Sequence, residues 1–319
     1  MLSVLYSNNF MNYELGIKLK HRAREENFEL VGIAQILPQK RLSLRSAASE
    51  AWLGAGHQAS MPWMQDPYRQ EIDQLLPGAK SILAVGLQYY TGIERNPEKL
   101  AIARYGWGED YHKIIDQRLR RIGRWLQEQR PNTRWRTCVD TAPFLDKTWA
   151  EEAGLGWIGK NSNLIHSQKG SWLFIGHLLT DVLLPYDKPA ESLCGSCRRC
   201  LEACPTGALT EPFVIDSRLC IAFHTIENRN SQLPENIKEH MGLWIAGCDI
   251  CQDVCPWNQS PLSFSKNLHL YPKSWLLNLT TQNTKMWKDE IWNRRLRGST
   301  LRRIKPWMWR RNIGHHTRT

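Results

Sequence analysis

The stretch Cys194 to Pro205 reads CGSCRRCLEACP, and residues 248–256 repeat part of it as CDICQDVCP. Both runs end on a cysteine that is followed directly by proline. Cys220 stands alone between them, so the region supplies eight cysteines. The two-residue spacing brings successive thiolates to adjacent corners of a cube, and the step before proline turns the chain toward a neighbouring site. The pattern therefore predicts two adjacent centres of four thiolates each.

The spacing also predicts which cysteines belong to which centre. In bacterial two-cluster ferredoxins, such a run gives three thiolates to one [4Fe–4S] cluster and its fourth to the other. Applied here, this rule assigns to the first cluster Cys194, Cys197, Cys200 and Cys255. The second cluster is then assigned Cys204, Cys220, Cys248 and Cys251.

Two simpler explanations of the cysteines fit less well. A zinc site pairs two short ligand groups and closes at four ligands, which does not match three cysteines in register plus a fourth before proline. Disulfides suit small secreted domains, whereas this chain has 319 residues and no secretory signal at its start. Cys138 has no motif around it, and we expect a buried, inert thiol.

Composition limits the class of protein. A chain of 319 residues can form two or three compact units with a sizeable core. The most apolar segment, Trp172 to Leu184, is interrupted by polar residues and is too short for a membrane span. We therefore expect no membrane association and a cytoplasmic location, where free thiolates can be loaded with iron and sulfide.

The net charge of +11 is concentrated near the end of the sequence. Residues 285–319 carry eleven Lys and Arg against two acidic residues, a net charge of +9. Among these cations lie Trp287, Trp292, Trp307 and Trp309. Such a stretch suits a phosphate backbone with exposed bases nearby, which indicates a nucleic-acid partner. The alternative is a solvated basic helix whose tryptophans attach it to the body.

Hydrophobic periodicity predicts an alternating α and β body before the cysteines. Helices are expected within 11–29, 47–52, 110–130 and 144–153. In the first helix one face should carry Leu15, Ile17, Leu19 and Ala23. Strands are expected near 30–36, 81–90, 133–139, 162–166 and 172–184.

Residues 154–159 read GLGWIG, which matches the glycine pattern of dinucleotide-binding loops. That site requires a strand before the glycines and a helix after them. Here a helix is predicted before them, and an extended polar segment follows. We therefore reject a dinucleotide site and expect the loop to admit a bulky ligand, with Lys160 and Asn161 pointing toward it.

Asp140 follows a predicted strand in the sequence VDTAP. A side chain at the end of a strand is often catalytic. It could equally cap the following helix, and spacing does not separate the two roles. Residues 103–112, ARYGWGEDYH, could line a cofactor or substrate pocket, although a helix N-terminus near Asp110 explains much of their composition.

Taken together, these segments resemble the epoxyqueuosine reductases. The resemblance rests on VDTAP, AGLGWIGKNSNLI at 153–165, GSWLFIG at 170–176, the run from Cys194, and GCDICQDVCPWN at 247–258. It continues in LLPGAKSIL, DYHK and RGSTLRRIK and covers nearly the whole chain. Because these motifs occur together and in this order, they are far more specific than the ferredoxin pattern alone.

The resemblance implies a mixed α+β and α/β fold. A cobalamin-binding α/β domain similar to that of reductive dehalogenases would be joined to a ferredoxin-like domain with two [4Fe–4S] clusters. We expect the catalytic domain over residues 1–185, the cluster domain over 186–262 and a basic tRNA-contacting segment over 263–319. The implied enzyme is an oxidoreductase that reduces epoxyqueuosine to queuosine at the wobble position of tRNA, the last step of queuosine biosynthesis.

The resemblance also implies roles for individual residues. Asp140 matches the family's catalytic acid and would protonate the departing oxygen while cob(I)alamin, fed by the clusters, supplies electrons. To act as an acid at neutral pH, it would need a raised pKa, which burial could provide. Contacts to cobalamin are expected from Trp63, Ala103, Tyr105, Asp140, Gly159, Lys160, Asn161, Leu164 and Ala222. Contacts to tRNA are expected from Arg294, Arg295, Arg297, Arg302, Arg303 and Lys305.

The expected partners are tRNA carrying epoxyqueuosine and an external low-potential electron donor, with the enzyme itself a monomer. Where many relatives have a serine–tyrosine pair after the lone cysteine, this chain has Ala222 and Phe223. A helical-repeat extension found in some members is also absent from these 319 residues. Rival interpretations are a reductive dehalogenase with the same cofactors, a two-cluster electron carrier, and an RNA-binding protein with structural clusters.

Overall fold

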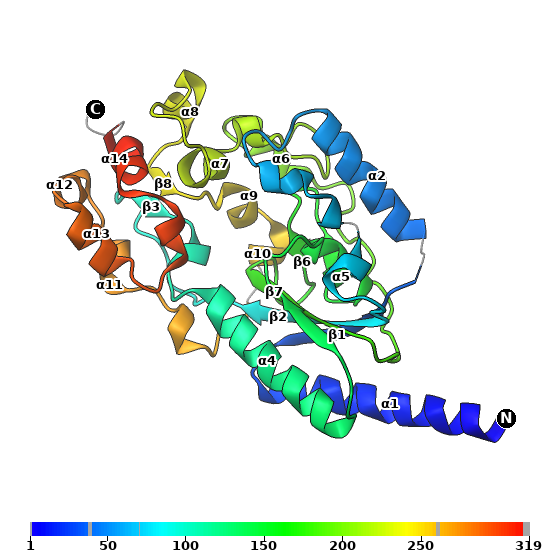
Figure 1. Ribbon diagram of the computed structural model, residues 1–319. Helices are drawn as coiled ribbons and strands as arrows, with labels where there is room; N and C mark the ends of the chain where they lie inside the picture. Colours follow the sequence, from blue (N-terminus) through cyan, green and yellow to red (C-terminus); the bar gives the residue numbers. More distant parts are fainter. Residues whose placement is uncertain (1, 38–39, 70, 260–261, 315–319) are drawn as a thin grey trace.

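The computed structural model describes residues 2–37, 40–69, 71–259 and 262–314 (Figure 1). Its centre is a four-stranded sheet in the order β1-β2-β7-β4. The strands are β1 (Leu30–Gln35), β2 (Ser81–Gln88), β7 (Leu173–Thr180) and β4 (Trp135–Cys138). In the central pair, Ser81 lies opposite Thr180 and Gln88 opposite Leu173. The four predicted strands that build this sheet are therefore confirmed, with shorter ends than expected.

All neighbours in this sheet are antiparallel. Neighbouring strands therefore end at opposite edges of the sheet, so the position of Asp140 after β4 does not by itself favour a catalytic role. The residue does follow a strand, but β4 is a short strand at the edge of an antiparallel sheet. The contacts around Asp140 decide whether its side chain faces a site.

Helices cover both faces of the sheet because its strands alternate two sets of apolar side chains. On one face Leu83, Val85 and Leu87 contact a core shared with two long helices, α1 (Leu2–Glu25) and α4 (Tyr111–Gln129). On the other face Ile82 and Ala84 contact a core shared with α3 (Ile72–Leu75) and α5 (Asp146–Glu152). Helix α2 (Lys40–Gly54) follows β1 along the chain.

One of the four residues predicted for the buried face of helix α1 lies elsewhere. Leu19 and Ala23 are buried against the sheet, whereas the Ile17 side chain is 50% exposed. The close contact on this helix is made by Gly16 instead, where an added Cβ would lie 2.7 Å from the Pro185 ring. Ile17 is rotated away from that contact because successive helical residues are about 100° apart.

The cysteine-rich part of the chain consists of short helices joined by turns. They are α6 (Arg199–Glu202), α7 (Ile221–Ile226), α8 (Glu235–His240), α9 (Ile250–Asp253) and α10 (Pro256–Gln259). Two small β-structures connect this part to the body. Strand β3 (Ala101–Ile102) pairs in parallel with β8 (Trp244–Ala246), and β5 (Trp157–Ile158) pairs with β6 (Leu164–Ile165).

The segment after residue 262 folds into helices α11 (Ser274–Leu277), α12 (Thr281–Lys285), α13 (Asp289–Arg295) and α14 (Pro306–Gly314). Trp287, Trp292 and Trp309 are buried in one hydrophobic cluster with Ile102 and Ile245. This cluster joins all three predicted domains, so the boundaries at 185 and 262 stay a prediction. The short 3-10 helices are η1 (Pro62–Gln65), η2 (Pro67–Arg69), η3 (Arg104–Gly106), η4 (Ser217–Leu219), η5 (Leu268–Leu270) and η6 (Thr300–Arg303).

Figure 1 shows α1 and α14 at opposite sides of the molecule, with the sheet between α4 and α5. Among the described residues, no helix is both long and apolar enough to span a membrane.

Candidate active site

A large cavity of about 1050 Å³ lies between the sheet, the N-terminus of α4 and the C-terminal segment. Its wall combines a 3-10 helix near residue 63, the loop after β4, and η6 of the basic segment. The residues that line it include Trp63, Tyr105, Asp110, Tyr111, His112, Asp140, Asp146, Lys147, Glu227, Arg302 and Arg303. We refer to it as the large cavity.

Asp140 stands at the wall of the large cavity in an unusual backbone conformation. Its φ is +48°, in the left-handed region that aspartate tolerates better than most residues. Carboxylate atom Oδ2 accepts a hydrogen bond from the Tyr111 hydroxyl at 3.0 Å and lies 3.1 Å from His112 Nε2. The side chain nevertheless keeps 63% of its surface accessible. Asp140 is therefore held in place and still open to a ligand.

His112 links Asp140 to Asp110. Asp110 is the N-cap of α4 and accepts a hydrogen bond from the His112 backbone N–H at 3.1 Å. Its Oδ1 also lies 2.8 Å from His112 Nδ1. The imidazole thus lies between two carboxylates, one at each ring nitrogen. The sequence places His112 in a segment that could line a pocket, but it does not pair this residue with Asp140, which is 28 residues away.

This arrangement fixes the charges of the two groups. Burial opposes a charged imidazole, but the hydrogen bonds to Asp110 and Asp140 outweigh it and raise the pKa of His112 to about 9. Burial would raise the pKa of Asp140, but His112 and the Tyr111 hydroxyl together lower it below its ordinary value. The raised pKa that we expected for Asp140 is therefore wrong for this structure: the carboxylate is ionised at neutral pH.

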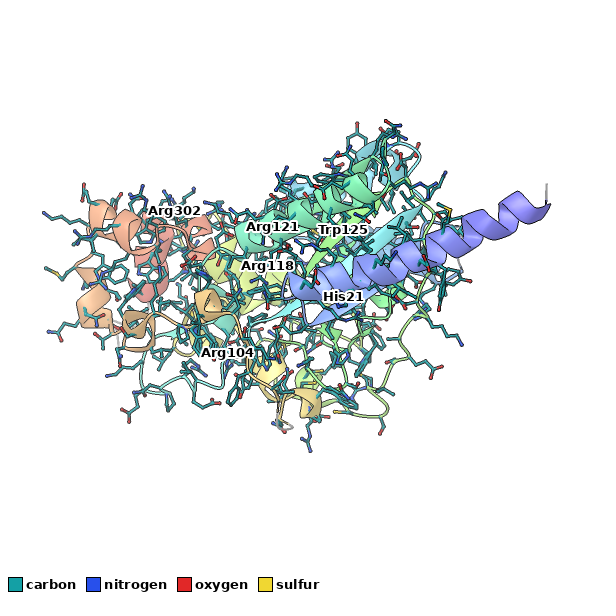
Figure 2. All side chains as sticks on the ribbon, turned by 90° about the horizontal axis from the view of Figure 1, so that it is seen from below. His21, Arg104, Arg118, Arg121, Trp125 and Arg302 are labelled. Atoms are coloured by element: carbon teal, nitrogen blue, oxygen red, sulfur yellow. The ribbon has the colours of Figure 1, made fainter. Side chains whose placement is uncertain are left out.

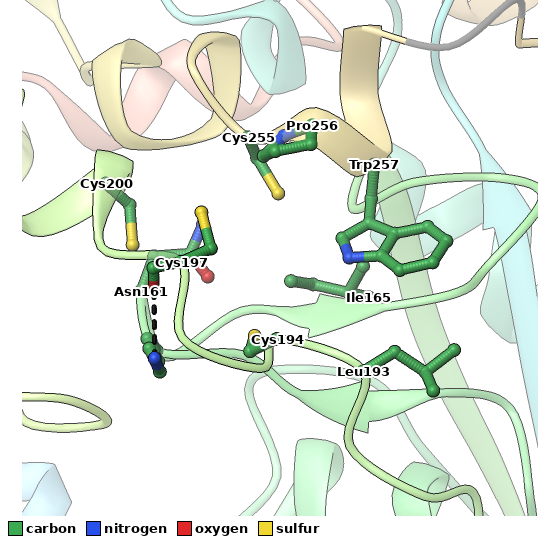
Figure 3. Close-up of a pocket in the computed structure, with 10 residues that line it drawn as sticks. Asn161, Ile165, Leu193, Cys194, Cys197, Cys200, Cys255, Pro256 and Trp257 are labelled. Carbon is green, nitrogen blue, oxygen red and sulfur yellow. Dashed lines mark hydrogen bonds between the residues drawn. The ribbon is translucent and has the colours of Figure 1, made fainter.

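The eight cysteines of the two motifs form two groups in space. A small cavity of about 250 Å³ is lined by Cys194, Cys197, Cys200 and Cys255 (Figure 3). Mutual electrostatic interactions connect the other four, Cys204, Cys220, Cys248 and Cys251. These are the two sets that the spacing predicted, although their role as cluster ligands stays a prediction. We call the first set the outer group and the second the inner group.

The two groups differ in their surroundings. Next to the outer group, Leu193 is 49% exposed, and Arg198 and Pro256 are also exposed. Next to the inner group, Ile221 and Asp249 are buried. The inner group is also linked to the large cavity, because Cys251 interacts electrostatically with Lys147, which lines that cavity.

A buried ion-pair network borders the inner group. Arg104 is 7% exposed and contacts Asp249 Oδ2 at 3.3 Å and Asp253 Oδ1 at 2.6 Å. Its backbone N–H donates to Asp249 Oδ2 at 2.9 Å. Its guanidinium also lies over the ring of Trp172 at 4.8 Å. These contacts attach α9, which carries Cys251, to the segment that ends at the large cavity.

The loop GLGWIG has α5 before it and contains β5, so it lacks the strand-then-helix order that a dinucleotide site requires. Strand β5 pairs with β6 in a hairpin, and an added Cβ on Gly156 would lie 2.2 Å from the Ile165 carbonyl oxygen. Lys160 Nζ donates to the carbonyl oxygens of Gly195 and Cys197 at 2.7 and 2.8 Å. The glycines therefore serve a tight approach of backbone to backbone.

The residues predicted to contact cobalamin divide into three sets. Trp63, Tyr105 and Asp140 line the large cavity. Lys160 and Asn161 line the small cavity instead, and Asn161 also donates to the Cys251 carbonyl oxygen at 3.2 Å. The linings of the two cavities do not include Ala103, Gly159, Leu164 or Ala222. As cobalamin contacts, all nine stay a prediction.

The six basic residues predicted to contact tRNA are also not equivalent. Arg295 stacks over the Trp275 and Trp287 rings at 5.3 and 4.9 Å. Arg303 pairs with Glu227 and lies over the Trp63 ring at 4.8 Å. Arg302, at the rim of the large cavity, donates to Asn293 Oδ1 at 3.4 Å. The remaining three, Arg294, Arg297 and Lys305, are exposed, as are Arg295, Arg302 and Arg303.

Figure 2 places Arg302 over the C-terminal helices and shows Arg118 and Arg121 on α4. Helix α4 starts beside the basic segment, because the Asp110 backbone N–H donates to the Gly298 carbonyl oxygen at 2.8 Å. Four tryptophans lie within residues 285–319. Trp287, Trp292 and Trp309 are buried in the core, whereas Trp307 is 40% exposed. For those three, the alternative that they attach the segment to the body is the correct one.

Cys138 is buried in the core of the body, at 1% exposure. Burial raises the pKa of its thiol to about 12, so it remains protonated. This agrees with the inert thiol expected from the sequence.

Comparison with known families matches two parts of the chain. A family described as "Epoxyqueuosine reductase QueG, DUF1730" matches residues 69–141, which include Tyr111, His112 and Asp140. A second, described as "4Fe-4S double cluster binding domain", matches residues 193–258, which include all eight motif cysteines.

Several relatives match nearly the whole chain. An epoxyqueuosine reductase from Synechococcus sp. (strain CC9605) is 60% identical over 294 residues, covering 92% of both chains. One from Vibrio cholerae is 36% identical over 313 residues, covering 95% of this chain and 83% of the relative.

Solved structures agree. The structure of an epoxyqueuosine reductase with an epoxyqueuosine-modified tRNA-Tyr stem loop has a TM-score of 0.84 and 26% identity, over 95% of this chain and 80% of that one. A structure of the reductase from Bacillus subtilis, with its catalytic aspartate loop swung out of the active site, has a TM-score of 0.84 and 25% identity over the same shares. The predicted mixed fold with a double-cluster domain is thereby confirmed.

Proposed function

The chain belongs to the epoxyqueuosine reductase family, and we propose that it reduces epoxyqueuosine to queuosine at the wobble position of tRNA. The enzyme is an oxidoreductase. One observation carries the proposal: a single large cavity has Asp140 and His112 on one wall and Arg302 and Arg303 on another. A base entering from an RNA held by the basic segment would meet a proton-donating pair in the same cavity.

The residues around the two cysteine groups fit [4Fe–4S] clusters. The outer group faces one cavity with apolar neighbours Ile165, Leu193 and Trp257. The Trp157 indole N–H donates to Cys194 Sγ at 3.4 Å, the type of contact that tunes a cluster. Two clusters would carry single electrons from an external low-potential donor toward the large cavity, with the inner group as the one linked to it.

The large cavity fits a bulky cofactor. Its volume of about 1050 Å³ lies at the upper end for sites that hold drug-sized ligands. Trp63 and Tyr105 provide flat apolar surfaces on its wall, which suit a macrocycle. We propose that this cofactor is cobalamin, which as cob(I)alamin supplies an electron pair to the substrate.

The chain's own residues would handle protons and orientation. Opening and removing an epoxide with two electrons also requires two protons, and the oxygen leaves as water. Asp140 is the group best placed to deliver a proton to the departing oxygen, because its accessible carboxylate faces the large cavity. The catalytic aspartate loop of the Bacillus subtilis reductase supports this assignment.

Binding of tRNA is assigned to the basic segment. Arg294, Arg297 and Lys305 have exposed side chains suited to phosphate contacts. Arg302 and Arg303 lie at the cavity itself and would meet the anticodon loop. The tRNA stem loop bound to the related reductase supports an RNA substrate for this chain. We also propose that the enzyme acts as a monomer in the cytoplasm, with its tRNA.

The direct test is anaerobic turnover. The clusters are reconstituted, cobalamin and a low-potential reductant are added, and epoxyqueuosine-containing tRNA is supplied. Nucleoside mass analysis should show loss of one oxygen, and only when cobalamin is present. Tight cobalamin binding without loss of oxygen would point to another reducible substrate. Absence of cobalamin binding would contradict the proposed cofactor.

A further inference from the structure

The reaction needs protons, yet the carboxylate that faces the substrate holds none at rest. The hydrogen bonds from His112 and Tyr111 keep Asp140 ionised at neutral pH. An ionised carboxylate cannot act as an acid until another group protonates it. The source must be within hydrogen-bonding distance of Asp140 and must itself be protonated.

We propose that His112 is the proton store of the active site, that its Nε2 proton reaches the departing oxygen through Asp140, and that Asp110 is a positioning residue for the ring. This inference rests on the proposed function, because it names the source of a proton that the epoxide reduction consumes. Nothing in the family comparison assigns this role to His112.

The ring of His112 is fixed in the orientation that this transfer requires. Asp110 holds Nδ1 at 2.8 Å, which leaves Nε2 to face Asp140 Oδ2 at 3.1 Å. The imidazole stacks on Tyr111 with ring centroids 4.1 Å apart. Tyr111 in turn stacks on Phe174 of β7 at 3.9 Å with an interplanar angle of 6°. A ring held by two carboxylates and an anchored aromatic stack has little freedom to rotate.

The charged groups around the imidazole favour its protonated form. On the side of α4, Asp110 contacts the imidazole, the Tyr111 ring stacks on it, and Lys113 acts electrostatically on Asp110. From the segment after β4 come Asp140, Asp146 and Lys147, and from the C-terminal segment comes Arg303, which interacts with Asp140 and Tyr105. Among the residues that the structure describes, only the carboxylates of Asp110 and Asp140 contact the ring nitrogens, and they raise the pKa of His112 to about 9.

Bonds, protons and electrons balance in this transfer. As the epoxide C–O bond breaks, negative charge develops on its oxygen. The Nε2–H bond of His112 breaks, Asp140 Oδ2 gains that proton, and a proton from the Asp140 carboxyl forms the new O–H bond. His112 is left neutral, between two carboxylates, and recovers a proton from solvent. The same path then supplies the second proton, and the oxygen leaves as water, while both electrons come from the low-potential donor.

The test compares three variants of the full chain. His112→Gln keeps hydrogen-bonding capacity at the site but cannot hold a titrating proton. Asp110→Asn keeps His112 and Asp140 but removes one of the two charges that hold the proton. His269→Gln is the matched control, since the His269 ring is 65% exposed and faces Glu109. Iron content and circular dichroism confirm that each variant folds.

The first measurement is single-turnover deoxygenation of epoxyqueuosine-tRNA across pH. The wild-type rate should fall about tenfold per pH unit above a pH of about 9. His112→Gln should be at least about 100-fold slower at neutral pH, within the usual contribution of acid–base catalysis. Asp110→Asn should move the decline to lower pH, and His269→Gln should match the wild type.

The second measurement does not need turnover. Histidine-labelled protein without cofactors or tRNA is titrated by NMR, and the His112 signal is identified by its loss in His112→Gln. The ring should titrate near 9 in the wild type and at lower pH in Asp110→Asn. Turnover by His112→Gln at the wild-type rate, or a ring titrating near its ordinary value, would overturn the inference alone. A wild-type enzyme that binds cobalamin and tRNA but removes no oxygen would overturn the proposed function and this inference together.

Discussion

The molecule contains two cavities with opposite chemistry. The large cavity is lined by charged side chains, among them His112, Asp140 and Arg303, with a net of hydrogen bonds between them. The small cavity is lined by thiols and by apolar neighbours such as Leu193 and Trp257. Charged groups in hydrogen-bonded pairs exchange protons, whereas thiolates in an apolar site suit iron–sulfur clusters that exchange electrons. In the proposed reaction, protons and electrons would therefore be supplied from separate parts of the fold.

The inner cysteine group lies between these two regions. Cys251 interacts electrostatically with Lys147 of the large cavity, and Asn161 of the small cavity donates to the Cys251 carbonyl oxygen. The segment that holds Cys251 is thus in contact with both sides. Electrons entering at the outer group would reach the large cavity through this segment, without crossing the charged pair of His112 and Asp140.

The largest effect is expected from Asp140→Asn. The amide cannot pass on a proton, so the turnover rate should fall by a factor of about 10² to 10⁴. Iron content should match the wild type, because the change leaves the cysteine groups untouched. The control is Asp181→Asn, at a carboxylate that pairs with Arg134 at the other end of β4. Equal losses of turnover in both variants would indicate a general structural effect and would contradict separate roles for the two cavities.

A smaller effect is expected on stability, through the charge of His112. Its pKa is raised in the folded chain, so the ion pairs stabilise the fold fully below about pH 6.5 and lose that contribution as pH rises through about 9. Denaturant unfolding of wild type and His112→Gln should differ by on the order of 2 kcal/mol at neutral pH. The difference should vanish at about pH 10, and a difference that persists there would contradict the charge assignment.

Asp140 shifts in the opposite direction and sharpens the same comparison. Its pKa is lowered on folding, so its contribution is present above the ordinary value and is lost as pH falls through the folded value. Asp140→Asn should therefore differ from the wild type in unfolding free energy at neutral pH and converge with it in acid. No such convergence is expected for substitutions at the small cavity that leave the charged pair intact.

Substitutions in the basic segment should have a weaker effect. Arg297→Ala should reduce tRNA affinity about threefold to tenfold and lower the slope of log affinity against log salt by about one. Arg295→Ala should leave that slope nearly unchanged and lower the melting temperature, because its guanidinium stacks on Trp275 and Trp287. Fluorescence binding at several salt concentrations separates the two. Equal salt slopes for both variants would show that stacking on Trp275 and Trp287 does not keep Arg295 from phosphate contact.

The smallest effect is expected at the small cavity itself. Trp157→Phe removes the N–H that donates to Cys194 Sγ at 3.4 Å. Losing a donor to a cluster sulfur makes reduction harder, so the potential of the outer cluster should become more negative, by on the order of tens of millivolts. A redox titration followed by electron paramagnetic resonance measures it. A shift to a more positive potential would contradict this account of the cavity.

Parts of this arrangement were predictable from the sequence because they depend on local spacing. The two groups of four cysteines follow from short loops with fixed steps, and α4 follows from a regular apolar stripe. Other parts depend on contacts between distant segments. His112 and Asp140 meet only when α4 and β4 lie side by side on the sheet. Lys160 faces the small cavity because of the direction of the β5–β6 hairpin, and no local sequence pattern determines that direction.

The basic segment shows the same limit from another side. Its charge is visible in the sequence, and the nucleic-acid prediction rests on it. The sequence does not show that Trp287 and Trp309 stack on each other, with centroids 5.8 Å apart, in a core shared with residues near 102 and 245. Aromatic residues among cations can face RNA or face the core, and only tertiary packing decides between them.

The central claim is that the two cavities supply electrons and protons independently. Rapid mixing of reduced donor with loaded Asp140→Asn enzyme and epoxyqueuosine-tRNA tests it, with absorbance following the cofactors and mass analysis following the nucleoside. The account predicts electron uptake at the wild-type rate and little or no loss of oxygen from the tRNA. Electron uptake slowed as much as deoxygenation would contradict it, because Asp140 would then be needed for both.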